Sequence, residues 1–227
     1  ALPLFAIVFT KYLHFFIELE PWQEVLVKGL FIFSLTTVNI FGVKLGGRVN
    51  DVLTMMKLAP LVLVIVLGFV FLTYNPEKLA QNYTPIAPLG WDNFGSALVL
   101  IFWAYAGFEM GTLPASEVKN PKQVIPKAII IGMLLVVLFY LSTNFVLYGT
   151  INWVELSHST LPLVLAGTLV IGYIGGMIVS FGALASVSGT SSSFILGVSR
   201  LYYAMSDEGL LPKVFSKVHK KYKTPYM

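Results

Sequence analysis

The sequence predicts an all-α membrane protein, and three observations lead to this fold class. Hydrophobic residues make up 56% of the 227 residues and charged residues only 11%, whereas a soluble domain carries about 25% charged residues. The apolar residues gather in runs of about 20, the length that a helix needs to cross a bilayer core. Runs such as LVLVIVLGFVF (61–71) and AIIIGMLLVVLFYL (128–141) are also continuous, and they lack the alternation typical of barrel strands.

Six apolar segments are expected to span the membrane within a single transmembrane domain. They cover about 1–17, 25–45, 50–73, 94–117, 125–150 and 161–203, and a basic cytoplasmic loop follows at 204–227. The fourth segment is expected to break near 106–108. The last is too long for one span, so we expect either a break near Gly172 to Gly176 or a tilted helix that continues beyond the bilayer. The chain starts inside an apolar stretch and stops without a closing one, which predicts an internal fragment of a longer protein.

Basic and acidic residues alternate between the loops on the two sides of the predicted membrane region. One side holds Lys44, Arg48, Lys119, Lys122, Lys127, Arg200, Lys213, Lys217, Lys220, Lys221 and Lys223. The other side holds Glu18, Glu20, Glu24, Glu77, Asp92 and Glu155, with Lys28 and Lys78. Because Lys and Arg concentrate in cytoplasmic loops, we expect the basic side to be cytoplasmic. This bias explains the basic tail without a nucleic-acid partner.

The fourth segment, which contains IFWAYAGFEMGTLPASEVKNPK (101–122), is interrupted by helix-breaking residues. Gly107 and Gly111 are poor helix formers, and Pro114 cannot donate to the helix ladder. Unwound backbone is tolerated in a membrane only where it lines a protein cavity, and discontinuous helices of this kind bind substrates and ions. Alternatively, the small residues allow close helix packing. Composition alone leaves both readings open.

Two charged residues fall inside predicted spans. Glu109 follows the break, and inserting such an acid costs at least about 2.5 kcal/mol unless it faces a cavity or a partner. Lys57 lies about 12 Å into its helix if that helix starts near Val49. Because burial favours the neutral form of each group, both are candidate proton carriers. The alternatives are a structural carboxylate at Glu109 and a fixed charge filling a cation pocket at Lys57.

Hydroxyl groups cluster in the last apolar segment, in SFGALASVSGTSSSF (180–194). They could bind sodium or meet Lys57, or they could bond to their own helix backbone while the small residues pack closely. His14 and His158 lack metal-ligand spacing, and the chain has no Walker-type phosphate loop, nucleophile elbow or paired carboxylates. We therefore expect neither an enzyme nor a cofactor or metal site.

Three stretches resemble the amino acid permeases of the amino acid–polyamine–organocation superfamily. GFEMGTLPASEVKNPKQVIPKAI (107–129) is similar to the family's sixth helix and following loop, and SRLYYAMSDEGLLPKVFSKVHKKYKTP (199–225) to its eighth helix and the loop after it. GGRVNDVLTMMK (46–57) resembles the fifth helix of proton-coupled members. The resemblance implies a leucine-transporter-like fold with two inverted five-helix repeats, of which this chain runs from about helix three to the start of helix nine.

The resemblance also implies a substrate site. Ala106 and Gly107 match the unwound backbone that meets the substrate's amino group. Trp103 stands where one member has a gating tryptophan. Phe194 stands where that member stacks a tryptophan on its cationic substrate, so an aromatic wall is kept while stacking on a cation is in doubt.

A proton-coupling site is implied in the same way. Lys57 matches the lysine whose ammonium group takes the place of a sodium ion, with hydroxyls near Ser188 and Thr190 as its neighbours, in a register uncertain by two or three residues. Glu109 matches a proton-sensing glutamate.

The expected function is therefore secondary active transport of amino acids across the plasma membrane, by proton-coupled symport and alternating access. The alternatives are an exchanger of amino acids or polyamines and a non-transporting amino acid sensor of the same fold. The expected partners are the amino acid, protons and the lipid bilayer, and a homodimer is left open.

Overall fold

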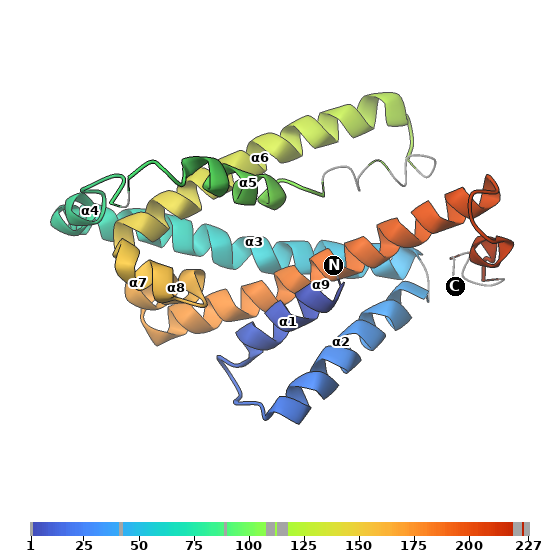
Figure 1. The fold of residues 1–227 in the computed structure, drawn as a ribbon, viewed down its shortest axis with the longest axis horizontal. Helices are drawn as coiled ribbons and strands as arrows, with labels where there is room; N and C mark the ends of the chain where they lie inside the picture. Colours follow the sequence, from blue (N-terminus) through green and yellow to red (C-terminus); the bar gives the residue numbers. More distant parts are fainter. Residues whose placement is uncertain are drawn as a thin grey trace. The chain divides into compact units, whose positions relative to one another are not determined.

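The computed structural model describes residues 2–40, 43–88, 90–107, 112, 118–219 and 224. The chain forms two compact units, Ala1–Val62 with Met177–Met227, and Leu63–Gly176. The fold is all-α, as the sequence predicts, and the described part contains no strand. The α-helices are α1 (Leu2–Leu13), α2 (Pro21–Ile40), α3 (Val43–Tyr74), α4 (Pro76–Asn82), α5 (Phe94–Ala104), α6 (Pro121–Thr150), α7 (Trp153–His158), α8 (Pro162–Ile171) and α9 (Tyr173–Asp207), followed by the 3-10 helix η3 (Lys213–Ser216) (Figure 1).

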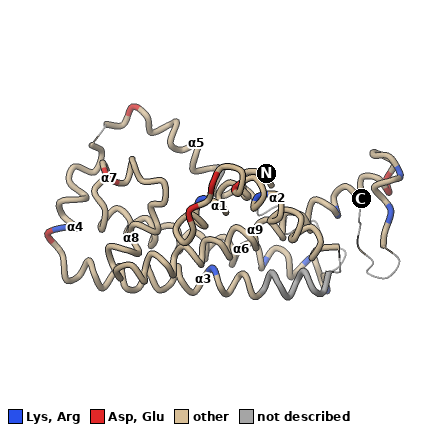
Figure 2. The backbone as a smooth tube through the Cα atoms, turned by 90° about the horizontal axis from the view of Figure 1, so that it is seen from below, with Lys and Arg blue, Asp and Glu red and all other residues tan. Residues whose placement is uncertain are grey.

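Four helices of the described chain are long and apolar enough to cross a membrane. They are α2, the Val52–Tyr74 part of α3, α6 and α9. Charged residues are sparse along these helices and lie mostly near helix ends and in connections (Figure 2). Most apolar side chains of α6 face outward, as expected of a helix in contact with lipid.

Proline and glycine mark several helix boundaries. Prolines occupy the first turns of α4, α6 and α8, where the missing N–H group would have no helical partner. Gly172 ends α8 with φ = 80°, a backbone conformation that favours glycine, and α9 starts at the next residue. The long last segment is thus broken at Gly172, inside the range that the sequence predicts.

In the first unit, aromatic rings and polar groups join α1, α2 and α9. Phe9 of α1 stacks on Phe31 of α2 with ring centroids 4.4 Å apart. Near the other end of this hairpin, His14 Nε2 lies 2.9 Å from Glu24 Oε1. Asn39 of α2 donates from Nδ2 to Ser192 Oγ of α9 over 3.0 Å. This unit therefore contains buried polar links between helices as well as apolar contacts.

In the second unit, α6 is the centre of the packing. Its Phe145 ring stacks on Phe69 of α3 at 5.4 Å, and a Cβ added at Gly68 would clash with Val146. The Asn82 amide at the end of α4 donates to the Gly149 carbonyl over 2.9 Å. The C-terminal half of α6 thus packs against α4 and against the C-terminal half of α3.

Candidate functional site

The fourth apolar segment is helical only over Phe94–Ala104, which is much shorter than a span. A turn follows at Tyr105–Gly107, so the helix ends just before the break predicted at 106–108. Ala106 and Gly107 are exposed, and Gly107 has φ = 111°, which glycine adopts without strain. Both residues predicted to carry unwound backbone therefore lie outside a helix.

Two other residues predicted in this segment are only partly described. Trp103 is the second-last residue of α5, and its side chain lies outside what the structure describes. Glu109 lies outside the described residues altogether. The gating and proton-sensing roles of these two residues stay predictions.

Tyr140 of α6 holds the C-terminal end of α5, and the sequence analysis missed this residue. Its hydroxyl donates to the Ala104 carbonyl over 3.0 Å, and its ring meets the Tyr105 ring edge-on at 5.3 Å. The last carbonyls of a helix have no partner within the helix, so the bond satisfies a group that the break leaves bare. The sequence feature that could have indicated this bond is a single tyrosine inside the apolar run IIIGMLLVVLFYL, since a hydroxyl there needs a partner.

Lys57 lies in the first unit, on α3, and is half-buried. It makes no hydrogen bond or ion pair with another residue that the structure describes. An ammonium group in a spanning helix is costly without a partner. The ammonium group of Lys57 is therefore not balanced by an acid or bonded to a hydroxyl in the described part of the chain.

The contact between α3 and α9 sets the register of Lys57 along the serine run. A Cβ added at Gly182 would lie 2.7 Å from Pro60 Cγ, so the two helices meet closely there. In this unit α9 runs antiparallel to α3 (Figure 1). Lys57 precedes Pro60 by about 4.5 Å along α3, and the same distance beyond Gly182 on α9 reaches Ala185. The nearest hydroxyl to that level is Ser186, about 6 Å beyond Gly182.

The two hydroxyls predicted to neighbour Lys57 lie further along α9. Ser188 and Thr190 are about 9 and 12 Å from Gly182 along the helix. Ser188 Oγ donates to the Leu184 carbonyl over 2.8 Å, and Thr190 is exposed. Ser186 is therefore the better candidate neighbour, two residues from the predicted position.

Phe194 lies on α9 and is half-buried. Its ring meets Phe5 of α1 edge-on, with centroids 6.3 Å apart at 69°. This is a favourable geometry for an aromatic pair. Phe194 thus packs against a second aromatic ring, from α1, and its role in a substrate wall stays a prediction.

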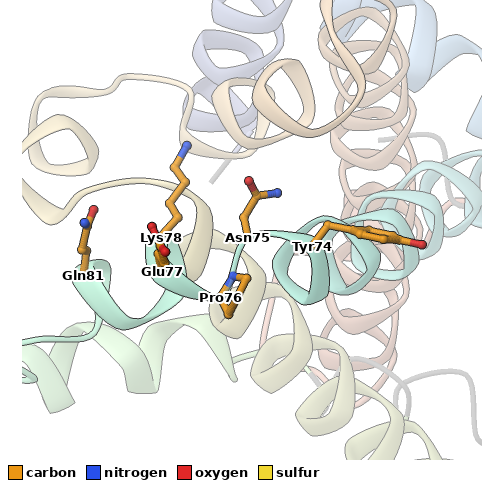
Figure 3. Close-up of a pocket in the computed structure, with 6 residues that line it drawn as sticks. All are labelled: Tyr74, Asn75, Pro76, Glu77, Lys78 and Gln81. Carbon is orange, nitrogen blue, oxygen red and sulfur yellow. The ribbon is translucent and has the colours of Figure 1, made fainter.

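A hollow of about 430 Å³ lies at the junction of α3 and α4 (Figure 3). It is lined by Tyr74, Asn75, Pro76, Glu77, Lys78 and Gln81, none of which is a predicted site residue. In the close-up, Tyr74 points away from the polar side chains of α4. All six lining residues come from one short stretch, 74–81, so no distant part of the described chain contributes to the hollow.

Tyr83, which directly follows α4, links this helix to α6. Its hydroxyl donates to the Phe145 carbonyl over 3.2 Å. Burial, with a smaller contribution from Tyr148, raises the pKa of the Tyr83 phenol above its ordinary value. The phenol therefore stays neutral and keeps its donor at physiological pH. No group of three or more His, Cys, Asp or Glu within the described ranges could hold a metal ion.

An apolar helix that ends at Ala104, well short of a span, beside long apolar helices is compatible with a membrane transport protein, and the comparisons with known proteins show the family. The family described as amino acid permease matches residues 1–227. The chain belongs to this family, whose members are transporters and not enzymes. It is accordingly an integral, multi-pass membrane protein.

Several curated proteins are similar to this chain. A branched-chain amino acid permease of Bacillus subtilis (strain 168) is 30% identical over 200 residues, which cover 86% of this chain and 41% of the relative. A serine/threonine exchanger of the same organism is 29% identical over 92% of this chain and 48% of the relative. A cystine/glutamate transporter of Pongo abelii is 32% identical over 99% of this chain and 46% of the relative. The chain thus spans less than half the length of each.

Proposed function

We propose that the protein containing this chain is a secondary active transporter that carries amino acids across the plasma membrane by proton-coupled symport. Membership of the amino acid permease family supports amino acids as the substrate class. The observation that carries the proposal is the end of α5 at Ala104, followed by exposed, non-helical backbone at Ala106 and Gly107. Such backbone offers carbonyl and N–H groups to a zwitterion inside an apolar segment.

Substrate closure is assigned to Trp103 and Phe194. A rigid aromatic side chain covers apolar area at a small entropic cost. The Phe5 ring packs edge-on against Phe194. A phenylalanine ring attracts a cation less strongly than a tryptophan ring does. With Phe194 at this position, the site is expected to favour amino acids without a positively charged side chain.

Proton coupling is assigned to Lys57 and Glu109. Lys57 is half-buried and forms no ion pair or hydrogen bond with a described residue, so its charge state depends on how far its surroundings exclude water. A carrier group drives transport only if its proton affinity differs between the inward-facing and outward-facing states. Ser186 is the hydroxyl best placed along α9 to accept from a protonated Lys57.

Exchange of one amino acid for another is the second candidate function. One relative with 29% identity is named a serine/threonine exchanger. An exchanger needs the same broken helix, but it returns to its starting state only with a second substrate bound. The two functions therefore differ in whether the empty carrier can reorient.

Reconstitution of the intact protein in liposomes distinguishes the two. Labelled branched-chain amino acids, serine and threonine are offered outside, with or without an inward proton gradient and with or without unlabelled amino acid inside. Symport predicts accumulation driven by the gradient into empty liposomes. Uptake that requires internal amino acid and ignores the gradient would replace symport with exchange. Absence of both uptake and exchange with any amino acid would favour a sensor.

A further inference from the structure

The chain reverses direction directly after α9, and hydrogen bonds fix this reversal. Gly209 has φ = 80°, the left-handed conformation that commonly ends helices. The N–H groups of Leu210 and Leu211 both donate to the Met205 carbonyl, over 2.8 and 3.3 Å. The last turn of α9 is thus closed by the residues that follow it.

Side chains then hold the following segment against the last turns of α9. Ser206, which is buried, donates from Oγ to the Pro212 carbonyl over 2.8 Å. The Tyr202 and Phe215 rings lie 6.1 Å apart. The helix η3 therefore has a fixed place beside the end of a spanning helix (Figure 1).

A second attachment lies further along the chain. Thr224 is buried and donates from Oγ1 to the carbonyl of Ile40, the last residue of α2. The His219 N–H group in turn donates to the Thr224 carbonyl over 2.8 Å. The segment after α9 is thus anchored at the ends of two spanning helices, α9 and α2.

The outer surface of this anchored segment combines apolar and basic side chains. Leu210 is 67% exposed and Val214 is 39% exposed. Lys213 and Lys217 are exposed beside them, and neither forms an ion pair with a residue in the described ranges. The sequence continues with three more lysines, Lys220, Lys221 and Lys223, against the acids Asp207 and Glu208 at the turn. We name Leu210, Lys213, Val214 and Lys217 the α9 foot.

We propose that the α9 foot binds anionic lipid headgroups at the cytoplasmic surface of the membrane. Lysines next to the cytoplasmic end of a spanning helix attract anionic lipids. Exposed leucine and valine beside them match the boundary between headgroups and acyl chains. Charge bias alone would account for the lysines, but it gives no reason to expose Leu210 and Val214 on a segment that is anchored in place.

The test measures which lipids the intact protein retains. The purified protein in detergent is titrated with phosphatidylglycerol or phosphatidylcholine, and bound lipid is counted by native mass spectrometry. We expect phosphatidylglycerol to be preferred. The variant with Lys213→Gln and Lys217→Gln loses affinity for it by about fivefold per lysine. The matched control, Lys119→Gln with Lys122→Gln, removes two exposed lysines on the same predicted side and retains the preference.

Two further arms decide the chemistry of the site. The variant with Leu210→Ser and Val214→Ser is expected to lose phosphatidylglycerol, while glycerol 3-phosphate at equal concentration does not compete. Competition by glycerol 3-phosphate would overturn the proposal in favour of a soluble-anion site. Equal loss in the Lys119/Lys122 control, or no preference for the anionic lipid, would also overturn it. Lipid binding is measured without any transport assay. Its result therefore tests the lipid site independently of the proposed transport function.

Discussion

Asn39 differs from most polar residues inside the spanning helices. Thr36, Ser188 and Ser191 each donate to a carbonyl of their own helix, so their hydroxyl protons do not join helices. Asn39 also bonds to its own helix through the Leu35 carbonyl, but its amide reaches Ser192 on α9 as well. Both Asn39 and Ser192 are buried. This bond is therefore a direct polar link between α2 and α9.

A double-mutant cycle measures this link. Asn39→Ala and Ser192→Ala are expected to show a coupling energy of about 0.6 kcal/mol, the average for hydrogen bonds between helices in a membrane. Unfolding of the single and double variants in detergent gives the value. Ser34→Ala is the control, because Ser34 bonds to Phe31 on its own helix. A coupling between Asn39 and Ser192 no larger than that between Ser34 and Ser192 would contradict the link.

For single residues, the sequence indicated candidate site residues, but it did not indicate which atoms those residues contact. Lys57 was singled out because it is a charged residue inside a predicted span. Phe194 was singled out because it matches a position of the family's substrate site. Their neighbours were not visible, because the Pro60–Gly182 contact sets the register of α3 on α9. Phe5 and Tyr140 were missed because aromatic residues in apolar runs are common and only folding shows which one lies at a helix end.

The end of α5 is the element on which the proposed substrate site depends. The sequence predicted the break from its glycines and proline, and the structure ends the helix at Ala104. The length of α5 was not predictable, because no proline or glycine stands between Phe94 and Tyr105 except Gly95 at its start. Beyond this end Gly107 has a positive φ, and the Tyr140 hydroxyl donates to the Ala104 carbonyl. This hydrogen bond joins α6 to α5, and such a contact between helices cannot be read from the sequence.

Gly107→Ala is expected to impair transport, because alanine is strained by about 1 kcal/mol or more at a positive φ. A Cβ there meets nothing within 4 Å, so crowding would not explain a loss. Gly95→Ala is the matched control: Gly95 lies in the same segment, also with open space, but inside the helix. Initial uptake rates in liposomes give the comparison. Equal rates for Gly107→Ala and the natural protein would mean that the backbone conformation at the break is not needed.

The molecule as a whole divides into two compact units, and the predicted site residues divide with it. Lys57, Ser188, Thr190 and Phe194 belong to the first unit, and Trp103, Ala106 and Gly107 to the second. The sequence predicted the all-α class, which follows from composition and run length. It could not predict the division into units, which depends on contacts between segments far apart in the chain.

The orientation in the membrane can be tested because the chain contains no cysteine. Single cysteines at Lys122 and Lys217 are expected to react with an impermeant thiol reagent only from the cytoplasmic side. Cysteines at Glu77 and Glu155 are expected to react only from outside, since loops rich in lysine stay in the cytoplasm. All four side chains are exposed. Labelling of Lys122→Cys and Glu77→Cys from the same side would contradict the expected crossing of the fourth apolar segment, 94–117, which lies between them.

The most direct test of proton-coupled transport is amino acid uptake by Lys57→Ala in liposomes under an imposed proton gradient. The account predicts that the natural protein accumulates amino acid only with the gradient and that Lys57→Ala loses this dependence. Lys127→Ala, which removes an exposed lysine at the start of α6, retains it. Gradient-driven accumulation by Lys57→Ala at the natural rate, or uptake by the natural protein driven by sodium instead of protons, would contradict the account.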